Sequence, residues 1–321
     1  MEKNKVKILS VVLPTYNCGK LITGHISSMQ NWIDLADEIV VVDSHSTDGT
    51  LEHIKANLHH PNLLIIERDR GLYESWNEAV AQTSGKWVYI STVGDTIPRN
   101  HLENLLGAAE RFLVDVVISP KLRLNYDNGT SIICPASLNP KIYKYFKGKG
   151  IVLIEPCATD FFAFENAKPN SLMGSIAGDL FGGNHLRARP WPVEYGSHGD
   201  TAWTLRYGKE TRMCLLPIAG SVFSIHPKHS QPNEPINETM GRMYLNESPN
   251  NHETLLQRKV AKLWMEKRRG VKRSIYQATK IKLQYFYFRT LLKLNEIHRA
   301  KTVQLHTSFY PVSKEQKSLK L

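Results

Sequence analysis

Short runs of apolar, mostly β-branched residues recur near the N-terminus, and each run breaks into a polar loop. The first two runs cover residues 8–13 and 38–42, and the loops that follow them begin at Pro14 and Asp43. A continuous apolar run predicts a strand buried on both faces of a parallel sheet. Ligands of such sheets bind beyond the carboxyl ends of the strands, so two adjacent loops of this kind predict a nucleotide pocket.

The alternation of strand and helix patterns continues through the first 100 residues. Further strands and helices are predicted at 62–67, 86–91, 19–32, from Thr50 onward and at 72–83. Asp48 stands where it can cap the helix that begins near Thr50. Strands that alternate with helices predict an α/β fold built on a parallel sheet.

The pattern is less regular beyond residue 100. It predicts helices at 101–114 and 199–208, strands at 116–119 and 213–216, and a long helical segment from 253 to about 301. The polar stretch 120–150 shows little periodicity, so we interpret it as a variable connection. The sequence has no apolar run of the roughly 18 residues that a membrane-spanning helix needs, and its first apolar run ends early in a polar loop. We therefore expect a cytoplasmic location.

The charge of the chain changes this picture only at its C-terminal end. The net charge is +11, and residues 251–321 hold 17 Lys and Arg against four Glu, so the rest of the chain is slightly negative. Basic helical residues and aromatic residues are mixed over 253–305. This mixture suits an anionic membrane surface, which suggests a peripheral position on the inner face of the plasma membrane. Alternatively, the segment packs back on the preceding domain. Nucleic acid is not expected as a partner, because no nucleic-acid module precedes it.

Four sequence blocks carry a resemblance to a known family. They cover residues 10–17, 41–50, 67–79 and 85–95. In order and spacing they resemble the family 2 glycosyltransferases, which are inverting enzymes that use nucleotide-diphosphate sugars. The resemblance implies the GT-A fold, a Rossmann-like and mostly parallel sheet flanked by helices. It also implies a sugar transfer from a donor, UDP-linked in our expectation, to a hydroxyl of a cell-surface glycan or a lipid-linked precursor.

The resemblance also divides the chain. We expect a GT-A domain over 1–250, with a donor half over 1–100 and an acceptor half over 101–250, and a basic helical tail over 251–321. The four cysteines are far apart and form no metal-binding pattern, so neither zinc nor disulfides are expected.

The first three blocks, together with Gly94 of the fourth block, supply the expected nucleotide-sugar site. Its residues are Pro14, Thr15, Tyr16, Asp43, Asp69, Arg70, Asn77 and Gly94. By resemblance, Asp43 accepts from the imide N–H of a uracil, while Pro14, Thr15 and Tyr16 line the base. The alternative for Asp43 is a local role in opening a turn and capping a helix.

The resemblance assigns the metal to the pair Gly94 and Asp95. Relatives often carry two carboxylates here, as Asp-x-Asp or Ala-Asp-Asp, and this chain keeps only the last one. One carboxylate suffices for Mn2+ or Mg2+ when substrate phosphates and water supply the other oxygen ligands. His226 is the expected second protein ligand, although His229 competes for that role. The alternatives are an ordinary turn at Gly94 and a structural or solvated histidine.

The candidate general base is Asp200. It follows Gly199, where relatives commonly have Glu, and precedes an aromatic and a Leu-Arg pair, as in the family's acceptor-side segment. An acceptor hydroxyl must lose its proton as it attacks the anomeric carbon, and a carboxylate facing the donor can take that proton. The alternatives are a helix N-cap at Asp200 and His198 as the base.

Two rival functions remain open at this point. The first is a catalytically weak nucleotide-fold protein that binds membrane or nucleic acid through its basic tail, which the missing carboxylate beside Asp95 favours. The second is a sugar nucleotidyltransferase. That class needs a Gly-rich phosphate loop after the first strand, and the sequence from Pro14 to Asn17 is not such a loop.

Overall fold

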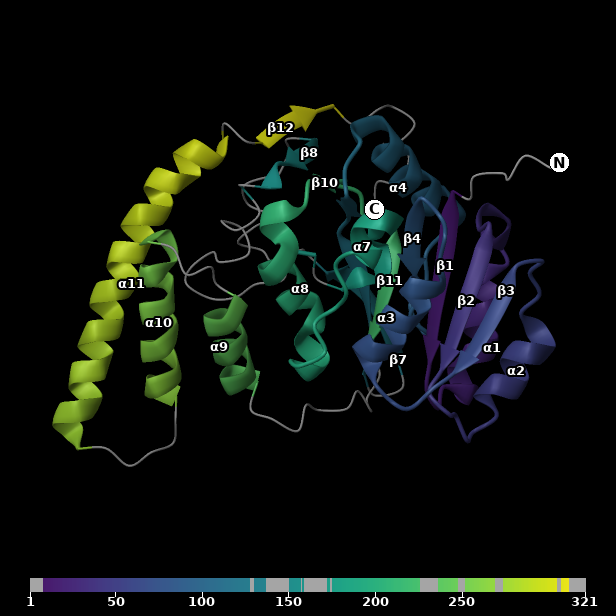
Figure 1. Ribbon diagram of the computed structural model, residues 1–321, viewed down its shortest axis with the longest axis horizontal. Helices are drawn as coiled ribbons and strands as arrows, with labels where there is room; N and C mark the ends of the chain where they lie inside the picture. Colours follow the sequence, from purple (N-terminus) through teal and green to yellow (C-terminus); the bar gives the residue numbers. More distant parts are fainter. Residues whose placement is uncertain are drawn as a thin grey trace.

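The structure is a computed structural model of the whole chain. It describes residues 8–127, 130–136, 150–156, 158, 172–173, 175–225, 236–247, 252–268, 274–304 and 307–311. The part described is an α/β fold with a large twisted sheet, helices on both faces of that sheet, and a helical C-terminal segment to one side (Figure 1).

The main sheet has the strand order β12-β8-β10-β5-β9-β4-β1-β2-β3. Four neighbouring strands from the first 100 residues run parallel: β1 (Leu9–Thr15), β2 (Glu38–Asp43), β3 (Leu63–Glu67) and β4 (Trp87–Ile90). The other half mixes directions and contains β5 (Val116–Ile118), β8 (Ile151–Ile154), β9 (Leu180–Gly182), β10 (Met213–Leu215) and β12 (Thr307–Tyr310). The predicted strands and the mostly parallel sheet are therefore confirmed.

Helices cover both faces of this sheet. They are α1 (Gly19–Met29), α2 (Thr50–Asn57), α3 (Leu72–Gln82), α4 (Arg99–Phe112), α7 (Gly183–Arg187) and α8 (Gly199–Tyr207). Alternate residues of β1 face opposite sides, so Val11 packs in the core under α1 and α4, while Val12 packs in the core under α3. Burial on both faces explains the continuous apolar run of this strand.

The core under α3 also buries large aromatic side chains from the second half of the chain. Trp191 and Trp203 are 2% and 0% exposed and lie in the same cluster as Trp76 of α3. Of the residues predicted on one face of α3, Trp76 and Val80 are buried, whereas Leu72 is 49% exposed. Leu72 stands at the start of α3, where the sheet edge opens to solvent.

The prediction of a variable connection over 120–150 was wrong in its first part. Residues there form β6 (Lys121–Asp127) and β7 (Thr130–Ala136), an antiparallel pair. β11 (Ser221–Ile225) pairs in parallel with β6 to complete a second, small sheet. β11 lies almost 100 residues after β6 in the sequence, so no local sequence pattern predicts that these strands pair.

The basic segment is helical, as predicted. α9 (Ile236–Glu247) lies beside α8, and α10 (His252–Arg268) and α11 (Ile275–Gln304) lie side by side (Figure 1). Beyond α11 the chain returns to the sheet, where β12 pairs antiparallel with β8. The domain division at residue 250 stays a prediction. Among the helices that the structure describes, none combines the length and the apolar character needed to cross a membrane.

Candidate functional site

Hydrogen bonds join the loops that follow β1 and β2. The Thr15 hydroxyl donates to the Asp43 carboxylate at 2.7 Å. The Asn17 N–H donates to the Ser46 hydroxyl at 2.9 Å, and the Asn17 side-chain oxygen accepts from the Thr47 N–H at 2.9 Å. These bonds bring the two polar loops together at one edge of the sheet, as the sequence predicts for a nucleotide pocket.

Asp48 links the two helices that leave these loops. One carboxylate oxygen accepts from the Gly19 N–H at the start of α1, at 2.9 Å. The other oxygen accepts from the N–H and the hydroxyl of Thr50 at the start of α2, at 3.2 and 2.5 Å. Asp48 therefore satisfies free N–H groups at two helix N-termini, one more than the sequence predicts.

Two residues of these loops have left-handed backbone conformations. Asn17 has φ of 44° and His45 has φ of 51°. Such values are uncommon for residues other than glycine and concentrate at sites where the surrounding structure fixes the backbone for function. The Asn17 conformation is fixed by its bonds to the second loop, which supports a site at this edge.

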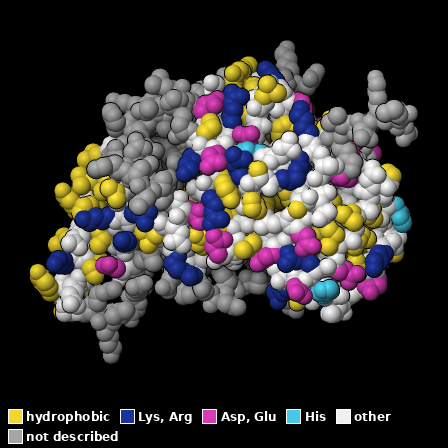
Figure 2. Space-filling model, viewed as in Figure 1, with side chains coloured by type: hydrophobic (Ala, Val, Ile, Leu, Met, Phe, Trp, Pro, Cys, Tyr) yellow, Lys and Arg dark blue, Asp and Glu magenta, His cyan; other side chains and the backbone are white. Residues whose placement is uncertain are grey.

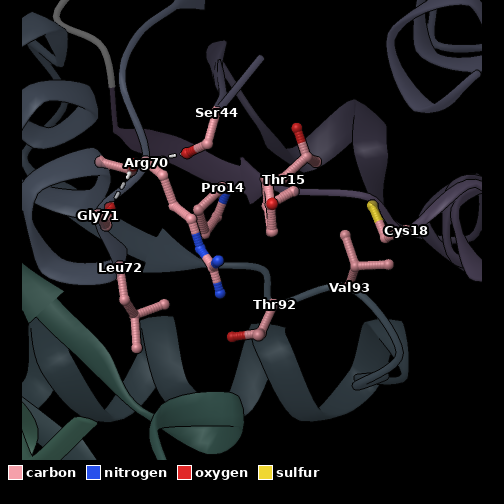
Figure 3. A pocket seen from close by; sticks show the side chains of 11 residues that line it. Pro14, Thr15, Cys18, Ser44, Arg70, Gly71, Leu72, Thr92 and Val93 are labelled. Atoms are coloured by element: carbon pink, nitrogen blue, oxygen red, sulfur yellow. Dashed lines mark hydrogen bonds between the residues drawn. The ribbon is translucent and has the colours of Figure 1, made fainter. Parts of the chain in front are cut away.

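An open cavity of about 290 Å³ lies where the loops meet α3 (Figure 3). Its lining residues are Pro14, Thr15, Tyr16, Cys18, Ser44, Arg70, Gly71, Leu72, Ser75, Thr92 and Val93. The Arg70 side chain extends into the cavity, and its guanidinium carbon lies 4.4 Å from the centre of the Tyr16 ring. A cavity with a cation, a ring and several hydroxyl groups can hold an anionic, aromatic ligand, and its volume is close to the lower end of small-molecule sites, about 300 Å³.

The predicted nucleotide residues divide into two groups. Pro14, Thr15, Tyr16 and Arg70 line the cavity. The other members lie outside this lining: Asp43, Asp69, Asn77 and Gly94. The sequence did not single out Cys18, Ser44, Ser75, Thr92 or Val93 for this lining; their only signal is that they lie in or next to the four blocks.

Asp43 lies directly behind the cavity wall. It is fully buried, and besides Thr15 its carboxylate accepts hydrogen bonds from the N–H and the hydroxyl of Ser46, each at 2.7 Å. The local turn-forming role considered for Asp43 is therefore present. Its neighbours Thr15 and Ser44 reach the cavity, and base recognition by Asp43 stays a prediction.

Asp69 and Asn77 occupy different surroundings from those expected. The Asp69 side chain is 99% exposed, with a carboxylate oxygen 3.9 Å from the His45 ring. The Asn77 amide donates to the Trp191 carbonyl at 2.9 Å and accepts from the Trp191 N–H at 2.7 Å. The amide of Asn77 therefore holds the segment around Trp191 against α3 and is not part of the cavity lining.

Gly94 and Asp95 follow the cavity residues Thr92 and Val93 in a turn. Gly94 has φ of 96°, a conformation that favours glycine. The Asp95 carboxylate accepts from the Ser224 N–H of β11 at 2.8 Å, and the Ser224 hydroxyl donates to the Gly94 carbonyl at 2.7 Å. Burial raises the pKa of Asp95 to about 7.

The small sheet therefore holds Asp95, the candidate metal ligand, in place through Ser224. No sequence motif indicated this contact. His226, the predicted second ligand, lies outside the described residues, immediately after β11. Within the described part of the chain, no group of three or more His, Cys, Asp and Glu side chains could hold a metal ion. The residues fit a cation that takes one carboxylate from the protein and other oxygen ligands from phosphates and water.

Asp200 lies in the first turn of α8 and is partly buried. Its N–H donates to the Tyr73 hydroxyl at 3.1 Å, and its carboxylate accepts from the Thr201 N–H at 2.6 Å. Burial raises the pKa of Asp200 to about 6. A carboxyl group with this pKa is mostly ionised at neutral pH and still basic enough to accept a proton.

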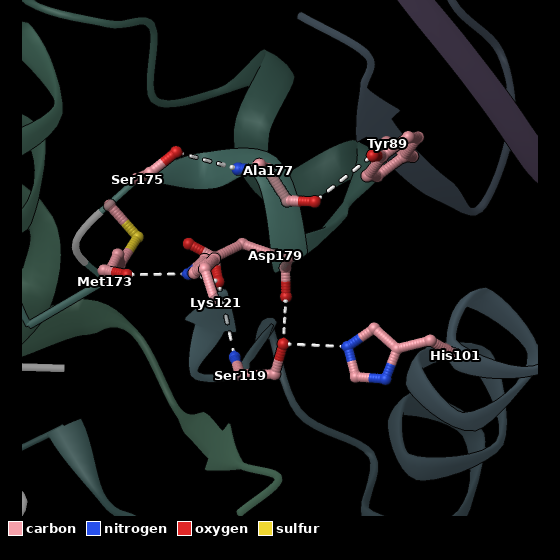
Figure 4. A network of polar contacts seen from close by, with 9 residues as sticks. Tyr89, His101, Ser119, Lys121, Met173, Ser175, Ala177 and Asp179 are labelled. Carbon is pink, nitrogen blue, oxygen red and sulfur yellow. Dashed lines mark hydrogen bonds and ion pairs between the residues drawn. The ribbon is translucent and has the colours of Figure 1, made fainter. Parts of the chain in front are cut away.

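A buried polar network around Lys121, which interacts electrostatically with both carboxyl groups, was not anticipated (Figure 4). The Lys121 ammonium is 2.6 Å from the Asp179 carboxylate, with side chains 5% and 0% exposed. The Ser119 hydroxyl donates to the Gly178 carbonyl at 2.8 Å and lies 3.0 Å from the His101 ring nitrogen. Lys121 lies in residues 120–150, for which the sequence pattern predicted only a variable connection. The sequence therefore gave no reason to expect a buried ion pair at this residue.

Comparison with known proteins relates this sequence to a family of enzymes. Residues 10–167 match the family model described as glycosyl transferase family 2. A PGL/p-HBAD biosynthesis glycosyltransferase of Mycobacterium bovis is 33% identical over 95 residues, which are 28% of this chain and 36% of the relative. The poly(ribitol-phosphate) beta-N-acetylglucosaminyltransferase TarS of Staphylococcus aureus is 30% identical over 114 residues, 34% of this chain and 20% of the relative. The chain thus matches about a third of the length of the mycobacterial relative and a fifth of the length of the staphylococcal one.

The fold has a counterpart among solved structures. The crystal structure of S. aureus TarS 1–349 in complex with UDP-GlcNAc matches with a TM-score of 0.57 and 18% sequence identity. The match covers 88% of this chain and 79% of that chain, and it establishes the GT-A fold. Fold, block order and family model agree. Residues 10–167, about half of the chain, belong to glycosyl transferase family 2.

Proposed function

We propose that the protein transfers a sugar from a nucleotide-diphosphate sugar, UDP-linked in our proposal, to an acceptor hydroxyl with inversion at the anomeric carbon. The observation that carries this proposal is the cavity at the ends of β1 and β2, where Arg70 and Tyr16 face a space suited to a nucleotide. The solved relative with the same fold binds UDP-GlcNAc, which supports a UDP-linked donor.

In this proposal Asp200 is the general base. The acceptor oxygen attacks the anomeric carbon, a new carbon–oxygen bond forms, and the bond from that carbon to the nucleoside diphosphate breaks. The hydroxyl proton passes to the Asp200 carboxylate as the bond forms. The Tyr73 hydroxyl and the Thr201 N–H, both bonded to Asp200, hold that residue in place.

We propose Asp95 as the protein ligand of Mn2+ or Mg2+, with His226 as a further candidate. When bound, such a cation would neutralise charge on the departing diphosphate. Arg70 would supply a second positive charge from the cavity side. The Ser224 N–H orients the Asp95 carboxylate, so β11 would determine how the ligand is presented.

We propose a surface glycan or its lipid-linked precursor as the acceptor. The name of the staphylococcal relative, a poly(ribitol-phosphate) beta-N-acetylglucosaminyltransferase, supports a polymer acceptor. The half of the chain that follows β4 would bind it, because Asp200 belongs to that half.

Calorimetry with UDP, GDP and dTDP, each with and without Mn2+, tests the donor site. We expect UDP to bind, to bind more tightly with Mn2+, and to lose that metal effect in Asp95→Asn. Glu103→Gln, which alters an exposed carboxylate of α4, is the matched control and should bind as the wild type does. Metal-independent or absent binding of all nucleotides would instead favour the rival function, a catalytically weak binding protein.

We also propose that α10 and α11 contact an anionic membrane surface at the cytoplasmic face of the plasma membrane. One face of α11 packs on α10 through Tyr285, together with Val260 and Leu263. The opposite face exposes Tyr276, Leu283, Tyr287 and Leu294, each between 58% and 75% exposed. The spacing of these residues places them on one side of the helix.

The charges around this apolar face fit an anionic partner. Lys259, Lys262, Lys267, Lys280 and Lys282 are exposed on the same pair of helices, and Figure 2 shows hydrophobic and basic side chains gathered there. Each basic side chain near an anionic surface contributes about 1 kcal/mol to binding. A second copy of the protein would bring like charges together, which disfavours self-association through this face.

Vesicle flotation tests this surface. The chain should float with vesicles that contain about 30% phosphatidylglycerol, release at about 0.5 M salt because of screening, and ignore neutral phosphatidylcholine vesicles. Leu283→Ser/Tyr287→Ser should lose flotation, whereas Leu113→Ser, at an equally exposed apolar site after α4, should keep it. Equal flotation of both variants would exclude α11 as the binding face.

A further inference from the structure

The start of α3 lies beside the cavity, but one of its side chains belongs to the core. Cavity lining comes from Arg70, Gly71, Leu72 and Ser75 (Figure 3). Tyr73 is outside this lining and only 4% exposed. Its ring packs on Trp76 and Trp191, with the ring centres 4.9 and 5.9 Å away. Packing therefore fixes the Tyr73 side chain next to the cavity and not in it.

The Tyr73 hydroxyl bridges two main-chain groups at the start of α8. The Asp200 N–H donates to this hydroxyl at 3.1 Å, and the hydroxyl donates its own hydrogen to the Ser197 carbonyl at 3.3 Å. An N–H group can only donate and a carbonyl can only accept, so the direction of both bonds is fixed. Burial raises the pKa of Tyr73, so the hydroxyl keeps the proton that the second bond needs.

This bridge supplies a helix cap from a distant part of the chain. The first N–H groups of a helix have no partner within the helix and need an acceptor from elsewhere. In the part of the chain that the structure describes, the side chain of His198, the residue before α8, makes no capping hydrogen bond. For the Asp200 N–H the acceptor is Tyr73, 127 residues earlier in the sequence. The place of Asp200 is therefore set by α3 as well as by its own helix.

Gly199 shows how closely the two helices approach. Its φ of −60° and ψ of −30° are ordinary right-handed helical values, so the backbone conformation does not require glycine. A methyl group added there would lie 2.5 Å from two carbon atoms of the Tyr73 ring and 2.7 Å from the Pro192 carbonyl oxygen. Non-bonded carbon atoms normally stay about 3.5 Å or more apart. Glycine is needed at this position because the Tyr73 ring lies directly against the backbone of α8.

We propose that Tyr73 is a positioning residue for the transfer reaction: it holds Asp200 at a fixed place relative to the cavity, so that the base and the donor site are parts of one packed structure. This inference rests on the proposed function, in which Asp200 is the base. Tyr73 touches neither donor nor acceptor in this account and acts through Asp200. A small displacement of a catalytic group can cost a large factor in rate, so loss of the hydroxyl should slow the reaction without weakening donor binding.

The test uses the full chain with water as the acceptor. Release of UDP is measured with Mn2+ from UDP-GlcNAc, UDP-glucose and UDP-galactose, and the sugar nucleotide that the wild type hydrolyses fastest is kept. Tyr73→Phe removes the hydroxyl and leaves the ring in place. We expect kcat to fall by about five- to twentyfold, with the donor KM within about twofold of the wild-type value.

Tyr89→Phe is the matched control. Tyr89 is 1% exposed and its hydroxyl donates to the Ala177 carbonyl at 3.2 Å, so this variant also loses a buried bond from a tyrosine to the main chain. Its kcat should stay within about twofold of the wild-type value, because the lost bond does not involve α8. Thermal unfolding would show that both variants are folded.

A double-mutant cycle separates a positioning role from a structural one. The base is absent in Asp200→Asn, so adding Tyr73→Phe to that variant should lower kcat by less than about twofold. If Tyr73 only stabilised the fold, its loss would cost the same factor in both backgrounds.

Gly199→Ala disturbs the same contact from the side of α8. It should lower kcat at least as much as Tyr73→Phe does, again with an unchanged donor KM, because the added methyl group pushes the Tyr73 ring and α8 apart. Gly107→Ala is the control on α4, where a methyl group would enter open space, and it should keep the wild-type kcat. A wild-type kcat for Gly199→Ala would contradict the proposal.

The outcomes separate this inference from the function beneath it. If the wild type hydrolyses a UDP-sugar and folded Tyr73→Phe does so equally fast, the role of Tyr73 is overturned and the transferase remains. Equal losses in both backgrounds of the cycle have the same meaning. If the wild type hydrolyses none of the three UDP-sugars, or Asp200→Asn hydrolyses them as fast as the wild type, the proposed function or its base is wrong and this inference fails with it.

Discussion

The Arg70 guanidinium carbon lies 4.4 Å from the centre of the Tyr16 ring, and both residues line the cavity beyond β1 and β2. Tyr16 follows β1 and Arg70 precedes α3, so this contact joins two blocks that are more than 50 residues apart. Both side chains are available to a ligand, because Tyr16 is 42% exposed and the cavity opens between them.

Arg70→Ala should weaken UDP binding by about tenfold, because it removes a cation near the expected diphosphate and a cation–π contact of about 1 kcal/mol. Calorimetric titration measures the loss. Arg99→Ala, which removes an exposed arginine paired with Asp34 and Glu103 on α4, should bind UDP as the wild type does. If wild type and Arg70→Ala bound UDP with equal affinity, the nucleotide would not bind beside Arg70 in this cavity.

Asp200→Asn should lower kcat by about 10²- to 10⁴-fold, because an amide cannot accept the acceptor proton. The UDP dissociation constant should change by less than about twofold, since Asp200 is not part of the cavity lining. Circular dichroism and thermal unfolding would show that the variant is folded. Near wild-type transfer by a folded Asp200→Asn protein would rule out the base assignment.

The wild-type kcat should fall on the acid side of about pH 6. Burial raises the pKa of Asp200 to about 6, so below that pH the carboxyl group is protonated and cannot act as a base. The expected loss is about tenfold per pH unit, measured at saturating donor and Mn2+. A flat profile down to pH 5 would mean that the base is another group.

Asp48→Ala should destabilise the protein by about 1–2 kcal/mol, because it leaves N–H groups at the starts of both α1 and α2 without their side-chain acceptor. Urea unfolding measures the change. Glu52→Ala, at an exposed position in the first turn of α2, is the matched control and should cost less than about 0.5 kcal/mol.

Asn77→Ala distinguishes a structural asparagine from a nucleotide ligand. It removes both hydrogen bonds to the Trp191 main chain, so we expect a loss of about 1–3 kcal/mol in unfolding free energy with an unchanged UDP dissociation constant. Gln82→Ala at the exposed end of the same helix should change neither quantity. If Asn77→Ala weakened UDP binding without changing the free energy of unfolding, Asn77 would be a nucleotide ligand.

Most of the donor half was predictable because its signals are local. A buried parallel strand needs a continuous apolar run, as in residues 38–43, and a helix start needs a capping side chain such as Asp48. Each signal lies within a few residues of the structure that it specifies. The order of the blocks then brought Thr15, Tyr16 and Arg70 to one edge of the sheet, where the structure has its cavity.

The rest depends on contacts between distant segments. β6 pairs with β11 across almost 100 residues, and only that pairing brings the Ser224 N–H to Asp95. From the sequence alone, the amide of Asn77 could have bound either a ligand or main-chain groups. Trp191 packs on α3, and this packing places its main-chain N–H and carbonyl within hydrogen-bond distance of the Asn77 amide.

The sequence by itself determined the α/β fold, the family, and the pair of loops that borders the cavity. Tertiary structure decided which carboxylates are buried, which amide is already bonded, and where Lys121 holds its charge. The physical reason is that local patterns encode strands, helices and caps, whereas burial and pKa depend on neighbours that the chain meets only when it folds.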